Sequence, residues 1–162
     1  MHDRASELIE VLGMQPHPEG GYFREIFRSA ERVVPEDRRG VRSALTTIYF
    51  LLTEGTFSRW HQVASDEVWH LYEGGPLQLF ELPESADNLR RHVLSPVDGE
   101  GGAPVWTIPA RHWQAARPVG SYALLGCTVG PGFEFADFRF LADVQDLAAR
   151  VRKVWPDVAE LV

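Results

Sequence analysis

Short runs in which apolar and polar residues alternate fill most of the chain between residues 22 and 140. In a β-strand successive side chains point to opposite faces, so alternation with a period of two is typical of strands. The runs are rich in β-branched and aromatic residues and are separated by Gly, Pro, Asp or Asn. The predicted strands are Tyr22–Arg28, Ser43–Leu52, Thr56–His61, Glu67–Tyr72, Leu77–Leu82, Arg90–Leu94, Val105–Ile108, His112–Ala116, Ser121–Val129 and Phe133–Phe140. The polar, charge-rich segment Ser29–Arg42 predicts an exposed loop.

Helical spacing appears only near the two ends of the chain. Leu8, Ile9 and Leu12 recur at helical intervals, and Gly13 supplies a stop, which predicts a helix at about residues 3–12. A second apolar stripe consists of Val144, Leu147, Val151 and Trp155. Because Pro156 cannot continue a helix, we expect the second helix at about residues 143–155, with its stripe covering the β-rich core.

Many short strands without helices between them favour antiparallel hairpins in a sandwich or barrel over a parallel sheet. The 162 residues suit one domain with a substantial core. We therefore expect a single all-β domain over residues 1–162, with a barrel core at about residues 20–141 and short N- and C-terminal helices.

The composition is that of an ordinary globular protein, with 44% hydrophobic and 24% charged residues. A net charge of -7 provides no basic surface for nucleic acid or anionic lipid, so we expect neither partner. A single cysteine, Cys127, cannot form an internal disulfide and is expected to be a buried thiol. Because the segment Met1–Arg4 also lacks a signal-peptide pattern, we expect a cytoplasmic protein. The apolar run Ala44–Leu52 is too short to span a membrane.

One segment places an imidazole and a carboxylate on neighbouring predicted strands. Gly55, His61, Glu67 and Gly74 have the spacing of the first cupin motif, in which the position of a second histidine is taken by Val63. Farther along, the run Pro109–Gln114 resembles the second cupin motif, with Arg111 at a glycine position and Gln114 at the histidine position. The neighbouring strands and the spacing of the first motif predict a barrel that directs His61 and Glu67 into one cavity.

Five separated segments narrow the resemblance, and their agreement is more specific than any one of them. They are His17–Glu25, Thr47–Leu52, Trp60–His61 with Ser65–His70, Trp113–Ala116 and Gly132–Phe138. Together they are similar to the signature of the Cupin_5 group of the RmlC-like cupin superfamily, long catalogued as a domain of unknown function. The resemblance covers about residues 5–145 and implies a double-stranded β-helix, the cupin jelly-roll barrel. It also implies a homodimer with a small-molecule cavity, and it assigns no reaction.

Three interpretations of the site remain open. A metal centre would use His61, Glu67 and Gln114, but the carboxamide of Gln114 is a poor ligand, and Val63 removes a further one. No cofactor is therefore the leading expectation, and a divalent metal in an oxygenase-type cupin is the alternative. A third interpretation is a protein that binds a small molecule without chemistry.

The leading interpretation is an isomerase or epimerase acting on a sugar or other carbonyl compound, as the resemblance to sugar-nucleotide epimerases implies. His61 would be the base, Glu67 or Asp66 would orient it, and Tyr49 or Tyr22 would supply the acid. The ligand is expected to be polar or anionic because guanidinium groups bind carboxylates and phosphates. The candidate ligand-binding residues are Arg24, Arg59, Trp69, Arg111 and Gln114. His70 is expected on the opposite face of its strand from Glu67.

Overall fold

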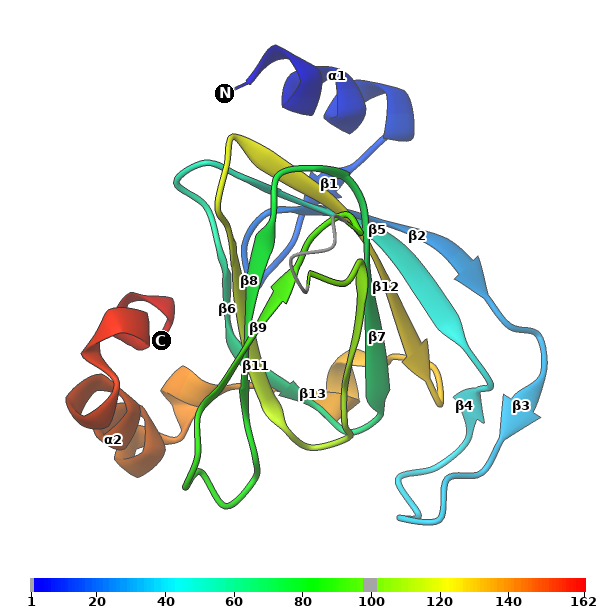
Figure 1. Ribbon diagram of the computed structural model, residues 1–162. Coiled ribbons are helices and arrows are strands. Elements are labelled where there is room, and N and C mark those ends of the chain that lie inside the picture. The colour runs from blue at the N-terminus through cyan, green and yellow to red at the C-terminus, as the bar shows by residue number, and fades with distance from the viewer. Residues whose placement is uncertain (1, 98–101) are drawn as a thin grey trace.

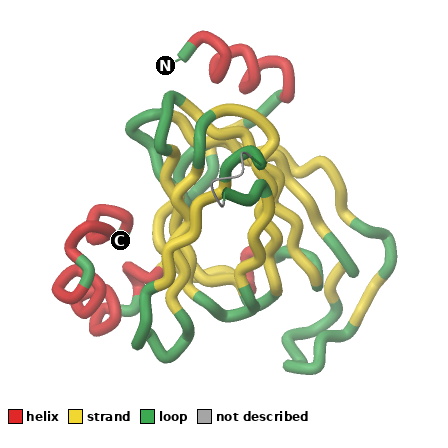
Figure 2. Tube along the Cα trace, in the orientation of Figure 1, coloured by secondary structure: helices red, strands yellow, loops and turns green. Residues whose placement is uncertain are grey.

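Two antiparallel β-sheets face each other in the computed structural model, which describes residues 2–97 and 102–162 (Figure 1). The six-stranded sheet has the order β1 (Gln15–Pro16), β2 (Tyr22–Arg28), β5 (Thr46–Thr53), β12 (Tyr122–Gly130), β7 (Asp66–Gly74), β10 (Val105–Ile108). The five-stranded sheet has the order β13 (Phe138–Phe140), β6 (Ser58–Val63), β11 (Trp113–Pro118), β8 (Leu77–Leu82), β9 (Arg90–Leu94). This jelly-roll arrangement confirms the predicted fold class. Figure 2 shows the strands gathered in the middle and the two α-helices outside them.

The strand register brings distant polar residues together. All pairings between the named strands are antiparallel, as predicted from the hairpin pattern. In the five-stranded sheet His61 lies opposite Gln114. In the six-stranded sheet Cys127 is the partner of both Ile48 and Trp69. Residues paired on neighbouring strands of one sheet therefore come from positions up to about 80 residues apart in the chain.

The structure differs from the sequence prediction in two segments. The loop Ser29–Arg42 contains β3 (Arg32–Val33), which pairs with β4 (Arg42–Ser43). The predicted strand Phe133–Phe140 is interrupted by the 3₁₀ turn η1 (Phe135–Asp137), so that only β13 remains. The prediction of a continuous strand is wrong because Asp137 anchors the turn: its carboxylate accepts two hydrogen bonds of 2.7 Å from Arg42.

Helices cover the outer faces of both sheets. The helix α2 (Gln145–Val154) and the 3₁₀ helix η3 (Pro156–Leu161) pack on the five-stranded sheet through the buried residues Val151 and Val158. Trp60 extends from β6 into this layer and donates to the carbonyl oxygen of Val158 at 3.3 Å. The helix α1 (Asp3–Leu12) packs on the six-stranded sheet through Ala5 and Leu8. In the described residues, no helix is both long and apolar enough to cross a membrane.

A tight turn between β1 and β2 lies in close contact with the barrel. Gly20 and Gly21 have φ angles of +116° and +68°, which favour glycine. A Cβ atom on either residue would overlap a carbonyl oxygen, that of Phe57 or of Leu51 respectively. The backbone N–H of Arg59 also donates to the carbonyl oxygen of Glu19 at 2.8 Å. The turn is therefore fixed on β5 and on the start of β6, next to His61.

Candidate active site

A cavity of about 100 Å³ lies between the two sheets, walled on one side by β2 and the segment 133–138. Its apolar lining consists of Phe23, Ile48, Val63, Cys127, Val129, Phe133, Phe135 and Phe138. Its polar lining consists of His17, Glu19, Glu25, Arg28, Thr46, His61, Glu67 and Glu134. The titratable side chains thus share a small chamber with aromatic walls, where burial favours neutral forms of acids and bases.

His61 and Glu19 form a buried pair. The His61 ring is 2% exposed and stacks on Phe138, with ring centroids 5.2 Å apart. Its Nδ1 lies 2.8 Å from the carbonyl oxygen of Arg59, which only accepts, so Nδ1 carries a proton. Its Nε2 lies 3.2 Å from Oε2 of Glu19. The other oxygen of Glu19 accepts a hydrogen bond of 2.9 Å from Ser58.

At least one of the two facing atoms, His61 Nε2 and Glu19 Oε2, carries a proton, because two facing lone pairs would repel each other. Burial lowers the pKa of His61, although the charge of Glu67 and the bond to Arg59 oppose this effect. Burial also raises the pKa of Glu19. Both effects favour the arrangement in which Glu19 carries the proton and the His61 ring beside it is neutral.

Glu67 is held in place by an oriented amide. The Nε2 group of Gln114 donates to Oε2 of Glu67, and the Trp69 indole N–H donates to Oε1 of Gln114 at 2.9 Å. Since an indole N–H can only donate, it fixes which end of the amide is oxygen. Glu67 is 7% exposed, and burial raises its pKa to about 7, against the opposing influence of His61. Near neutral pH, Glu67 therefore exists in both protonated and ionised forms.

The residues predicted to supply the acid and to orient His61 do not take these roles in the structure. Neither ring nitrogen of His61 contacts Glu67, since Arg59 and Glu19 occupy them. Tyr49 lies in the cluster beneath α1, with its ring 6.2 Å from that of Tyr72. Tyr22 belongs to the same cluster, and Asp66 accepts a hydrogen bond from the backbone of Ala110. None of these three predicted residues lines the cavity.

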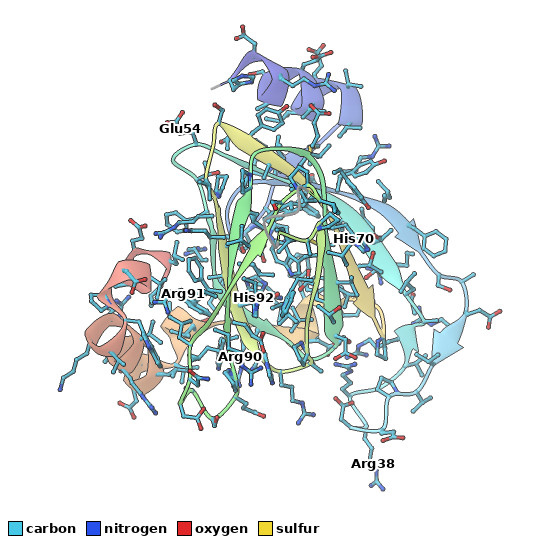
Figure 3. All side chains as sticks on the ribbon, in the orientation of Figure 1. Arg38, Glu54, His70, Arg90, Arg91 and His92 are labelled. Atoms are coloured by element: carbon cyan, nitrogen blue, oxygen red, sulfur yellow. The ribbon has the colours of Figure 1, made fainter. Side chains whose placement is uncertain are left out.

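The three predicted ligand-binding arginines also lie outside the cavity lining. Arg24 donates to the last carbonyl of α1 at 2.7 Å. Arg59 donates to the carbonyl oxygen of Pro18 at 2.7 Å. Arg111 pairs with Asp37 at 3.2 Å, beside the loop that follows β3. Trp69 is fully buried and reaches the site only through Gln114. His70, labelled in Figure 3, is not among the residues that line the cavity, which agrees with its expected position on the opposite face of β7 from Glu67.

The predicted metal ligands do not fit a metal ion as the structure arranges them. Gln114 directs its only oxygen toward the Trp69 indole and its N–H toward Glu67, and an amide N–H is not a metal ligand. Nε2 of His61 faces Glu19 instead of an open position. Within residues 2–97 and 102–162, no group of three or more His, Cys, Asp or Glu side chains has an arrangement suited to a metal ion.

The cavity residues that were not predicted as site residues include two from one turn. Glu19 and His17 come from the turn between β1 and β2, and their signal in the sequence was the run His17–Glu25 with its two consecutive glycines. His17 is 7% exposed at its side chain, and the edge of its ring meets the Phe23 ring at 4.5 Å. Burial lowers the pKa of His17, so the ring is neutral near pH 7.

The model of the family Cupin_5, described as Cupin superfamily (DUF985), matches residues 6–141. The chain belongs to the Cupin_5 family. This confirms the resemblance seen in the five sequence segments. No curated protein matches the chain.

Solved structures agree with the Cupin_5 assignment. A hypothetical protein from Leishmania major is 30% identical, with a TM-score of 0.84, over 98% of this chain and 96% of that one. A protein from Shewanella oneidensis is 26% identical, with a TM-score of 0.82, over 100% of this chain and 96% of that one. Oxalate decarboxylase from Bacillus subtilis is 14% identical, with a TM-score of 0.57, over 91% of this chain and 37% of that one. This last similarity concerns the cupin fold alone.

Proposed function

We propose that this Cupin_5 protein binds a small uncharged α-hydroxy carbonyl compound and moves a proton from its hydroxyl-bearing carbon to its carbonyl carbon, an isomerase-type reaction. The observation that carries the proposal is the pair of proton-active groups in one cavity. Glu67 has a pKa of about 7, and Nε2 of His61 lies 3.2 Å from the buried carboxyl group of Glu19. A general base is most efficient when its pKa lies near the working pH, and Glu67 meets this condition.

In the proposed reaction the ionised carboxylate of Glu67 removes a proton from the carbon beside the carbonyl group. The electron pair of the broken C–H bond forms a carbon–carbon double bond, and the carbonyl oxygen takes the proton held by the His61–Glu19 pair. Because the first carbon carries a hydroxyl group, the intermediate is an enediol. Glu67 delivers its proton to the former carbonyl carbon, and the hydroxyl group on the first carbon returns its proton to the His61–Glu19 pair as it becomes the new carbonyl, so no oxidant, reductant or net proton is required.

The assignment changes the roles that we expected for two residues. The sequence suggested His61 as base with Glu67 as its orienter. Because both ring nitrogens of His61 face other groups, Arg59 and Glu19, we assign Glu67 to the base and the His61–Glu19 pair to the acid, with its proton on Glu19. In this proposal that proton takes the place of the acid expected from Tyr49.

The charges of the cavity support an uncharged ligand over the expected anion. Arg28 is the one arginine in the lining, and all five of its N–H groups donate: two to Glu25, one to Glu134 and two to the carbonyl oxygen of Phe133. Four glutamates also line the cavity. A carboxylate or phosphate would therefore meet like charges and no free cation.

The size of the cavity supports a small ligand. At about 100 Å³, the cavity is smaller than the roughly 300–1,000 Å³ of pockets that enclose drug-sized ligands. Its aromatic walls suit the carbon skeleton of a compound with only a few carbon atoms. A sugar nucleotide, which the resemblance to epimerases suggested, would have to leave most of its atoms outside.

The test is hydrogen exchange in heavy water. Proton removal beside a carbonyl group replaces hydrogen with deuterium, and mass spectrometry detects it without knowledge of the net reaction. We expect exchange with small ketones such as hydroxyacetone, and a loss of at least about 10²-fold in Glu67→Gln, as for removal of a general base. His61→Gln is expected to slow exchange as well.

His70→Gln provides the matched control, because His70 lies outside the cavity lining. Exchange that survives in Glu67→Gln, or that falls equally in His70→Gln, would contradict the assignment. Saturable binding of the ketone without any exchange would instead support a binding protein without chemistry.

We also propose that the protein acts in the cytoplasm as a homodimer. Cys127 is buried and free, which suits a reducing compartment. The outer part of β2 exposes Ile26 and Phe27 at a sheet edge, which suits pairing with a second copy. Cell fractionation with an antibody tests the compartment.

A further inference from the structure

We propose that His17 is a catalytic residue, whose neutral Nε2–H group donates a hydrogen bond to the carbonyl oxygen of the ligand. The inference rests on the proposed function, because it assigns a residue to the same reaction. It concerns a histidine that the reaction described above does not use.

The backbone of Glu19 determines which nitrogen of His17 carries the proton. The Glu19 backbone N–H lies 3.2 Å from Nδ1 of His17 and donates to it. A nitrogen that accepts a hydrogen bond has a lone pair, so in the neutral ring the proton lies on Nε2. The carboxylate oxygen Oε2 of Glu19 is 3.7 Å from Nδ1, which is too long for a hydrogen bond.

The Arg59 carbonyl and the Glu19 backbone give the two histidines opposite tautomers. His61 has its proton on Nδ1, bound to Arg59, and presents the Nε2 lone pair to the Glu19 carboxyl group. His17 has its lone pair on Nδ1, bound to the Glu19 backbone, and presents Nε2–H. One imidazole is therefore an acceptor and the other a donor within the same cavity.

The His17 ring is held firmly while its Nε2–H remains available. The ring meets Phe23 and Phe50 edge to face, at 4.5 and 5.7 Å, and stacks on Phe135 at 6.5 Å. In the part of the chain that the structure describes, Nε2 has no hydrogen-bond partner. It is not one of the fully enclosed polar atoms without a partner, so it is accessible. Since His17 lines the cavity, this N–H group is open to a ligand there.

A neutral imidazole donor suits the proposed chemistry. When Glu67 removes the proton, negative charge develops on the carbonyl oxygen, and a fixed N–H donor in a water-poor cavity stabilises that charge. A charged imidazolium is not required, and burial among aromatic rings disfavours one. His17 transfers no proton in this role, so the proton balance of the reaction is unchanged.

The first experiment examines the tautomer in the free protein. Long-range ¹H–¹⁵N correlation spectra show which nitrogen of each imidazole carries the proton. We expect His17 protonated on Nε2 alone near neutral pH. A proton on Nδ1, or on both nitrogens, would overturn the inference.

The second experiment separates the donor from the turn that carries it. An Asn side chain places its oxygen near the Nδ1 position, so His17→Asn preserves the acceptor for the Glu19 N–H and removes the donor. A Gln side chain places an N–H near the Nε2 position, so His17→Gln preserves a donor. We expect His17→Asn to slow deuterium exchange of hydroxyacetone by about 10²–10³-fold, as for loss of one oxyanion donor, and His17→Gln to recover at least about tenfold of that loss. Equal rates in the two variants would contradict a donor role.

The third measurement does not depend on turnover. The ¹³C resonance of carbonyl-labelled hydroxyacetone moves when its oxygen accepts a hydrogen bond. With saturating hydroxyacetone we expect the full shift with the wild-type protein and with His70→Asn, and a smaller shift with His17→Asn, in which only the His61–Glu19 pair can donate to the oxygen. A His17-dependent shift without deuterium exchange would confirm the hydrogen bond from His17 and refute the isomerase. Exchange without a His17-dependent shift would refute the donor role of His17 and leave the isomerase standing, and absence of both would overturn both.

Discussion

Replacing Glu67 by Gln is expected to stabilise the protein at alkaline pH while removing the proposed base. The buried carboxyl group of Glu67 has its pKa raised from 4.5 to about 7. In the unfolded chain the same group ionises freely. Between pH 4.5 and about 7 the unfolded state therefore binds fewer protons than the folded state, and stability conferred by this group falls as the pH rises.

The size of the effect follows from this difference. The pKa lies about 2.5 above its ordinary value, and each pH unit of displacement corresponds to about 1.4 kcal/mol, so Glu67 costs about 3 kcal/mol above pH 7. Gln is nearly isosteric, carries no charge and can still accept the hydrogen bond from Gln114. Relative to wild type, the free energy of unfolding of Glu67→Gln should rise by about 3 kcal/mol between pH 4 and pH 8. For a domain of this size that corresponds to a relative increase in Tm of about 6–12 °C.

Urea unfolding, followed by the fluorescence of the five tryptophans, measures this difference at each pH. The control is Glu54→Gln, which removes one carboxyl group from an exposed turn between β5 and β6 (Figure 3). Its stability difference from wild type should change little with pH. A difference between wild type and Glu67→Gln that is equally independent of pH would refute the reasoning, because it would mean that Glu67 ionises in the folded protein as readily as in the unfolded chain.

Three further predictions concern the support of the site and the surface. Because the hydrogen bond from Gln114 lowers the pKa of Glu67, Gln114→Leu should move the rising limb of the pH–rate profile for deuterium exchange to higher pH. Gly126→Ala should destabilise the fold by about 1–3 kcal/mol in urea, because its Cβ would overlap the Tyr72 ring, and Tyr72→Ala should relieve part of that loss. Light scattering should give a two-chain mass for the wild type and a one-chain mass for Phe27→Asp, since Phe27 is 51% exposed on the β2 edge.

Much of the fold could be predicted because one face of each strand is buried and the other is not. The bounds of β2, β8, β9, β10 and α1 coincide with those predicted. The segment 133–140 escaped prediction, although its residues alternate as a strand would. There the contacts of Asp137 with Arg42, nearly a hundred residues away, stabilise a turn in place of a ladder. Local patterning carries no information about such a distant partner.

The same alternation explains why two predicted site residues, Arg24 and Tyr49, lie outside the cavity. Phe23 and Glu25 line the cavity, so Arg24 between them points to the opposite face of β2. Ile48 lines the cavity, and its neighbour Tyr49 therefore points toward α1. The period of two separates the two faces of each strand, but it does not show which of the two faces the cavity.

Motif spacing located His61 and Glu67 because they lie on β6 and β7, which follow one another in the chain and belong to the two facing sheets. It could not locate Glu19, which approaches from a turn about 40 residues earlier in the chain. That contact depends on how closely Gly20 and Gly21 approach β5 and β6, which is a property of three-dimensional packing. In the sequence, the indication that this turn belongs to the site was the family signature, which includes the segment His17–Glu25.

Because His17 and Glu19 belong to the turn ahead of β2, the two sheets by themselves contribute only His61 and Glu67 to the proposed reaction. The turn completes the site. A change of sequence in this short segment could therefore replace one set of proton donors by another, while the hydrophobic core and the strand order stay the same.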